Sequence, residues 1–174
     1  RNGNELRNLL YTALEYKDGP FAIRYPKASS EEFDQNLQAE LLPIGSWEVL
    51  QNGNDVAILA VGPLTYLALE AAEELKKLDI SCEVVNCRFI KPMDENYLEF
   101  MLEKFSSVLT IEEGVRSGGF GEGVLSWLSS NNYKGNSSII SLPDKFVEHG
   151  PRDLLLEKWG INKEEIIKTV TSFK

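Results

Sequence analysis

The feature that most constrains the fold is an unbroken apolar run, Val-Ala-Ile-Leu-Ala-Val, which covers residues 56–61 and ends at Gly62. A short run this uniformly apolar is typical of a strand that is buried on both faces, as in the centre of a parallel sheet. Parallel strands need long crossover connections, which are usually helices. We therefore expect an α/β fold with helices on both faces of a sheet.

The chain after this run supplies the helices and strands that such a sheet requires. Leucines and alanines recur at helical spacing from Leu64 to Leu78. Further strands are predicted over residues 82–86, 107–111 and 138–142, and further helices from Asp94, around residues 124–128 and from Asn162. Residues 44–50, before the turn at residues 52–53, predict an edge strand that folds back onto the central strand. Residues 44–174 should thus form a doubly wound, mostly parallel sheet.

The N-terminal part of the chain has a different character. A helical pattern begins at Asn4 as its cap, and residues 21–25 predict a short strand that Pro26 stops. One helix and one strand cannot bury their own apolar faces. We interpret residues 1–26 as the remnant of another domain, cut inside a longer protein, and the polar, acidic residues 27–43 as a linker.

Charge and composition exclude several functions. The net charge of −9, without a cluster of Lys or Arg, opposes nucleic-acid binding. No apolar run approaches the ~20 residues that cross a bilayer, so we expect a cytoplasmic protein with no membrane partner. The odd separation of Cys82 and Cys87 puts them on opposite strand faces, which argues against a disulfide. With one histidine in the chain, we expect no metal site.

Glycine-containing turns precede two predicted helices, where exposed N–H groups favour anions. One turn includes Gly62, and the other covers residues 118–123 but has Val124 where the dinucleotide fingerprint needs its last glycine. We prefer a structural interpretation, in which glycine allows close packing of helix on sheet. Glu112 and Glu113 end a strand near the expected ligand crevice, but adjacent strand residues point to opposite faces, which argues against an acid–base pair.

Four charged side chains remain as candidates. Arg24 lies among apolar residues of a predicted strand, so its guanidinium needs an anion, either a carboxylate of the protein or the phosphate of a substrate. The residues alone leave both possibilities open. His149 has no Ser or Cys nucleophile motif to serve, which favours a hydrogen-bonded structural histidine. Arg88 and Lys91 are expected to be salt-bridged or solvated.

Four segments together resemble the 1-deoxy-D-xylulose-5-phosphate synthases in order and spacing. They are residues 19–27, 84–94, 112–114 with 118–121, and 142–150. The closing Pro-Asp-x-Phe-x-x-His-Gly block is what separates this family from transketolases and from the β subunit of pyruvate dehydrogenase. The resemblance covers nearly the whole chain.

The resemblance implies an enzyme that condenses pyruvate with glyceraldehyde 3-phosphate, releases CO₂ and starts the non-mevalonate isoprenoid route. Such an enzyme uses thiamine diphosphate and Mg²⁺ and is expected to be a homodimer. Residues 1–26 would be the tail of its pyrimidine-binding domain, and residues 44–174 its transketolase C-terminal domain, which packs and dimerises. The cofactor motifs belong upstream, so the resemblance implies no catalytic, cofactor-binding or metal-binding residue here and an inactive isolated chain.

The resemblance assigns a role to one residue of this chain. Arg24 falls on the arginine of the family's Arg-Tyr-Pro motif, which implies a contact with the phosphate of the acceptor substrate. The family commonly continues with Arg-Gly, whereas this chain has Lys27 and Ala28, and a lysine lacks the planar fork of arginine. The alternatives are a separate, non-catalytic interaction subunit, or the same region of a transketolase or of a 2-oxoacid dehydrogenase E1 β subunit.

Overall fold

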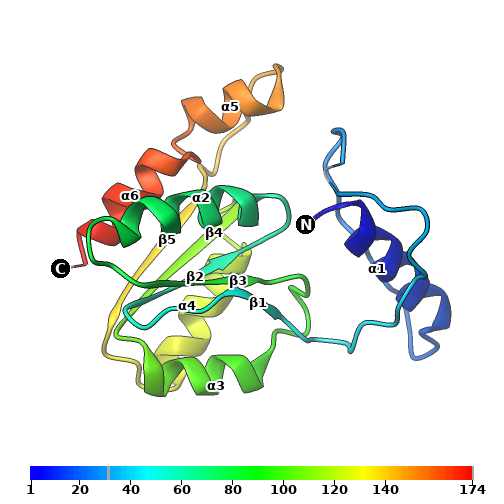
Figure 1. Cartoon of the computed structure of the whole chain (residues 1–174), viewed down its shortest axis with the longest axis horizontal. Helices are drawn as coiled ribbons and strands as arrows, with labels where there is room; N and C mark the ends of the chain where they lie inside the picture. The colour runs from blue at the N-terminus through cyan, green and yellow to red at the C-terminus, as the bar shows by residue number, and fades with distance from the viewer. Residues whose placement is uncertain (31, 174) are drawn as a thin grey trace.

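The computed structural model describes residues 1–30 and 32–173, and its centre is a five-stranded sheet with the order β1-β3-β2-β4-β5 (Figure 1). The strands are β1 (Glu48–Gln51), β2 (Val56–Ala60), β3 (Cys82–Asn86), β4 (Ser107–Val115) and β5 (Asn136–Leu142). β3, β2, β4 and β5 run parallel, and β1 is antiparallel to β3. The doubly wound, mostly parallel sheet is therefore confirmed.

Helices cover both faces of the sheet, as Figure 1 shows. The helices are α1 (Gly3–Glu15), α2 (Leu64–Lys76), α3 (Glu95–Lys104), α4 (Phe120–Ser130), α5 (Arg152–Lys158) and α6 (Lys163–Thr171). α2 and α6 pack on one face, and α3 and α4 pack on the other. The last helix starts where it was predicted, at Asn162, whose side chain caps it by accepting a hydrogen bond from the backbone N–H of Glu165. The short helix α5 was not predicted.

The central strand organises two apolar cores. All five residues of β2 are buried, and they alternate, with Ile58 in the core under α2 and α6 and Leu59 in the core under α3 and α4. This alternation follows from the period of two along a strand. Cys82 and Cys87 lie in different cores and are both free, which confirms their predicted separation.

The edge strand does not fold back onto the central strand. β1 pairs with β3 instead, with Glu48 opposite Asn86. The physical reason is that β3 and β4 already occupy both edges of β2, so the free edge of β3 is the position that remains. The predicted turn at Gly53 crosses the start of β3, where a Cβ would lie 2.1 Å from the carbonyl carbon of Cys82.

The N-terminal segment differs from the prediction at two points. α1 is capped by Asn2, whose side chain accepts from the backbone N–H of Glu5, whereas Asn4 lies inside the helix. Residues 21–25 form no strand, since a strand needs a neighbour to pair with and none is provided there by the described residues. α1 lies outside the layers of the sheet (Figure 1). The division at residues 1–26, 27–43 and 44–174 stays a prediction.

Candidate functional site

The carboxyl ends of β2 and β4 mark the place where open α/β sheets bind ligands, because the strand order reverses between them. The side chain found there is Glu112, which is 4% exposed. Its carboxylate accepts hydrogen bonds from the backbone N–H groups of Phe120 at 2.9 Å and Gly121 at 2.8 Å. A carboxylate of the chain itself therefore occupies the N-terminus of α4, the position that a phosphate would take.

The glycines of the second turn bring the backbone close to this carboxylate and to the sheet. A Cβ on Gly119 would lie 2.2 Å from the carbonyl oxygen of Val115, and one on Gly121 would lie 2.5 Å from the hydroxyl oxygen of Thr110. Neither position has room for a side chain. The structural interpretation of these glycines is confirmed.

Glu113 points away from its neighbour and binds α5. Arg152 donates from Nε to a carboxylate oxygen of Glu113 at 3.0 Å, with a second contact from Nη2. This hydrogen bonding raises the pKa of the Arg152 guanidinium. Glu112 and Glu113 thus have separate structural partners, and that they do not act as an acid–base pair stays a prediction.

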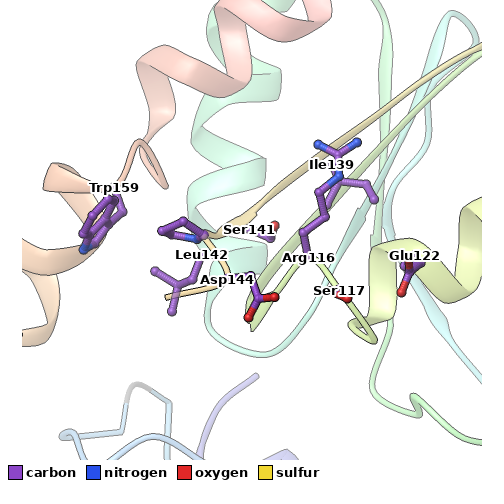
Figure 2. A pocket seen from close by; sticks show the side chains of 9 residues that line it. Arg116, Ser117, Glu122, Ile139, Ser141, Leu142, Asp144 and Trp159 are labelled. Atoms are coloured by element: carbon purple, nitrogen blue, oxygen red, sulfur yellow. The ribbon is translucent and has the colours of Figure 1, made fainter. Parts of the chain in front are cut away.

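A cavity of ≈ 480 Å³ opens beyond the carboxyl ends of β4 and β5 (Figure 2). Figure 2 shows Trp159 and Glu122 at opposite ends of it, with Arg116 and Asp144 between them. These residues come from the β4–α4 turn, helix α4, the loop after β5 and the end of α5. Their spacing in the sequence gives no signal of the cavity. Its lining carries both signs of charge and favours no single class of ligand.

Arg24 is exposed and lies on a stretch of chain that belongs to no helix or strand. Exposure alternates along it: Phe21 and Ile23 are half-buried, while Ala22 and Arg24 are exposed. No carboxylate of the described residues forms an ion pair with Arg24. The internal ion pair, one of the two partners considered for this guanidinium, is thus not formed within the described chain.

The segment that carries Arg24 is attached to the sheet by aromatic side chains. The ring of Phe21 lies edge-on to the ring of Phe89, with centroids 6.4 Å apart, and to that of Tyr16, at 5.7 Å. Phe89 follows β3 and is 6% exposed. Its carbonyl oxygen accepts a hydrogen bond from the indole N–H of Trp47 at 2.8 Å. No spacing in the sequence indicated this contact.

Polar side chains attach the start of α1 to the same end of the sheet. Asn86, the fully buried last residue of β3, donates to a carboxylate oxygen of Glu5 at 2.5 Å. Asn2 donates to the hydroxyl oxygen of Tyr66 on α2 at 3.3 Å. The N-terminal segment therefore covers the carboxyl end of β3 and the start of α2.

The three other candidate side chains meet the expectation only in part. His149 is exposed and has no hydrogen-bond partner among the described residues, so the prediction of a hydrogen-bonded structural histidine is wrong. It lies in the loop between β5 and α5. Arg88 is half-buried and donates to the backbone oxygen and the hydroxyl of Ser46, at 3.0 and 2.9 Å. Lys91 is exposed, as predicted.

The described residues lack two further kinds of feature. They contain no group of three or more His, Cys, Asp or Glu side chains placed to hold a metal ion. No helix among them has the length and apolar character to cross a bilayer. The expectation of no metal site in the whole chain stays a prediction.

Comparison with known proteins identifies the family. The family described as transketolase, C-terminal domain, matches residues 45–166. The 1-deoxy-D-xylulose-5-phosphate synthases of Bacillus cereus and Bacillus anthracis are 42% identical over 173 residues, which is 98% of this chain and 27% of those proteins. A solved structure described as a split gene transketolase, inactive beta4 tetramer, superposes with a TM-score of 0.74 at 31% identity, over 84% of this chain and 47% of that one. The chain spans about a quarter of the length of the curated relatives it matches, and it belongs to the transketolase C-terminal domain family.

Proposed function

We propose that this chain is the C-terminal part of a thiamine-diphosphate-dependent 1-deoxy-D-xylulose-5-phosphate synthase. The parent enzyme condenses pyruvate with glyceraldehyde 3-phosphate and releases CO₂, which commits carbon to isoprenoid precursors. The observation that carries the proposal is the 42% identity over 98% of the chain, because it includes the N-terminal segment that lies outside the matched domain at residues 45–166.

The residues of this chain do not fit thiamine diphosphate or its Mg²⁺. The N-terminus of α4, which could bind a diphosphate, is filled by Glu112, and the described residues hold no cluster of metal ligands. We therefore assign the cofactor to the part of the parent enzyme outside this chain. It follows that the isolated chain is inactive.

Within the parent enzyme, Arg24 binds the phosphate of glyceraldehyde 3-phosphate. Support comes from its exposed position, from the lack of an ion pair with any described carboxylate, and from the alternation of half-buried and exposed residues that precedes it at residues 21–23. A guanidinium offers two parallel N–H donors to phosphate oxygens, a geometry that lysine cannot reproduce. Lys27, three residues further along the chain, adds a positive charge but cannot offer a second planar pair of N–H donors.

The remaining contribution of the chain is packing and assembly. We propose that the parent enzyme is a cytoplasmic homodimer and that the transketolase C-terminal domain takes part in its interface. Support comes from large apolar side chains that the described chain leaves exposed on one end of the molecule: Phe146 is fully exposed and Leu154 is 68% exposed.

A second candidate is a separate, non-catalytic subunit that acts with a catalytic partner polypeptide. One observation favours it: the solved structure that superposes on this chain is described as a split gene transketolase in an inactive form. On this alternative the exposed apolar face of α1, with Leu10 and Leu14, would dock onto the partner.

The intact mass of the native polypeptide separates the two candidates. The polypeptide would be captured from source cells through a peptide within residues 44–174. The proposed synthase requires a mass nearly four times the 19.6 kDa of this chain, since the relatives are longer by that factor. A native mass near 19.6 kDa would instead establish the separate subunit.

A further inference from the structure

We propose that Phe89 of the transketolase C-terminal domain is a positioning residue for acceptor-substrate binding, which acts through Phe21 to hold Arg24 toward the substrate phosphate. This inference rests on the function proposed for Arg24. It gives the domain a role in substrate affinity although the domain supplies no group to the reacting atoms.

The first step of the argument is the freedom of the segment that carries Arg24. Among the described residues, no backbone-to-backbone hydrogen bond joins residues 17–29 to one another or to the rest of the chain. A segment without backbone hydrogen bonds has no fixed register, so side-chain contacts decide which way its residues point.

The second step is the alternation along this segment. Phe21 and Ile23 are half-buried, whereas Ala22 and Arg24 are exposed. This period of two, which ends at Arg24 because Tyr25 is 68% exposed, places Phe21 and Arg24 on opposite sides of the segment. Packing of Phe21 against the sheet domain therefore turns Arg24 outward, and loss of that packing would let the segment rotate.

The third step is that the partner of Phe21 is fixed. Phe89 is 6% exposed, and its carbonyl oxygen accepts from the indole N–H of Trp47 at 2.8 Å. The backbone N–H of Trp47 donates in turn to Asp94 at 2.7 Å, and its ring packs edge-on against Phe120 with centroids 5.7 Å apart. Phe89 is thus a buried residue whose backbone is held in place just after the end of β3.

Phe21 is the residue that joins the fixed and the free parts. Its ring meets Phe89 at an interplanar angle of 78° and Tyr16 at 70°, both edge-to-face arrangements that aromatic pairs favour. Tyr16 ends α1, so the ring of Phe21 is held between α1 and the sheet domain. The direction of Arg24, three residues further on, depends on this contact.

The test is steady-state kinetics of the intact parent enzyme with Phe21→Ala and Phe89→Ala, in the numbering of this chain. We expect the KM for glyceraldehyde 3-phosphate to rise several-fold, on the order of tenfold at most, with kcat and the KM for pyruvate unchanged. Phe21→Tyr, which keeps the ring, should restore the KM. Phe100→Ala, at an exposed phenylalanine of α3, is the matched control and should leave all constants unchanged.

The outcomes separate this inference from the function on which it rests. Loss of folded protein lowers the active fraction and hence kcat for both substrates, so it does not imitate a change in one KM. Should Phe89→Ala fail to fold, Phe21→Ala carries the test, because Phe21 is only half-buried. If Arg24→Ala raises the KM but Phe21→Ala does not, the positioning role is overturned. If Arg24→Ala leaves the KM unchanged, the proposed function of Arg24 fails and the inference fails with it.

Discussion

The carboxylate of Glu112 is bonded to the backbone N–H of Gly121 at 2.8 Å, which ties the end of β4 to the first turn of α4. The same carboxylate binds Phe120, so one buried side chain satisfies two N–H groups that a helix start leaves without partners. In this domain the helix terminus at the switch point serves structure and leaves no place there for a phosphate.

Removal of the Glu112 charge should weaken the fold. Glu112→Gln leaves one oxygen acceptor for two N–H donors and removes the charge at the helix terminus, so the free energy of unfolding should fall by about 1–3 kcal/mol. Urea denaturation of the chain measures this. Glu113→Gln is the control and should cost at most about 1 kcal/mol, because its ion pair with Arg152 is partly exposed. Equal losses from the two variants would contradict the buried cap.

Two glycines of α4 should respond in opposite ways to alanine. Gly121→Ala places a Cβ 2.5 Å from the Thr110 hydroxyl oxygen and should lower the free energy of unfolding by about 1–3 kcal/mol through overpacking. Gly123→Ala meets nothing closer than 4.0 Å and should raise it by up to about 1 kcal/mol, because alanine favours helix. Thermal unfolding of both variants decides the point; a stable Gly121→Ala would refute the close packing of α4 on the sheet.

The cysteines should be inert in the folded chain. Burial raises the pKa of the Cys82 thiol to about 12, and burial also raises the pKa of Cys87 well above its ordinary value. At about pH 8 neither should react with a thiol reagent until denaturant is added. Rapid labelling under native conditions would show that β3, or the residue that follows it, opens.

The raised thiol pKa also predicts a loss of stability in alkali. In the unfolded chain a thiol titrates near pH 8.5, so from about pH 8.5 upward the unfolded state loses a proton that the folded state keeps. The contribution of Cys82 to the free energy of unfolding is fully present below about pH 8.5 and declines as the pH rises toward about 12. Urea midpoints across this range should fall less steeply for Cys82→Ala than for the unaltered chain. If the urea midpoints of the two proteins fell in parallel with pH, the raised pKa of Cys82 would be contradicted.

The Arg24 side chain should govern affinity for one substrate. In the intact parent enzyme, Arg24→Ala should raise the KM for glyceraldehyde 3-phosphate about tenfold or more while the KM for pyruvate changes little, because a charge-assisted phosphate contact is lost. Arg24→Lys should have a KM for glyceraldehyde 3-phosphate between those of the unaltered enzyme and Arg24→Ala, since lysine keeps the charge but lacks the planar pair of N–H donors. Arg116→Ala removes another exposed arginine and serves as the control. An equal rise in both KM values would place Arg24 outside the phosphate site.

The sequence predicted those elements whose signal is local. The apolar run at residues 56–61 indicated β2, and Asn162 indicated the start of α6, because burial on both faces and capping each leave a mark on adjacent residues. The partner of β1 was predicted wrongly, since pairing depends on which edge stays free after the other strands have assembled. Residues 21–25 read as a strand, but a ladder needs a neighbour that the described chain does not supply.

For the candidate site, the sequence likewise indicated individual residues but not the partners they contact. The residue types at Arg24, Glu112 and Glu113 drew attention because charges at strand ends need partners. Their partners could not be predicted, as Arg152 lies 39 residues after Glu113 on a helix without a periodic signal. The contact of Phe21 with Phe89 likewise joins residues far apart in the chain, and aromatic type alone indicates burial but no partner.

The most direct test of the proposed function is an assay of the purified native protein. The protein would be supplied with thiamine diphosphate, Mg²⁺ and glyceraldehyde 3-phosphate, and either pyruvate or a ketose phosphate would serve as the donor. We predict that pyruvate yields 1-deoxy-D-xylulose 5-phosphate with one CO₂ per product, and that the 174-residue chain alone yields none. Turnover of the ketose phosphate without use of pyruvate would contradict the account and identify a transketolase.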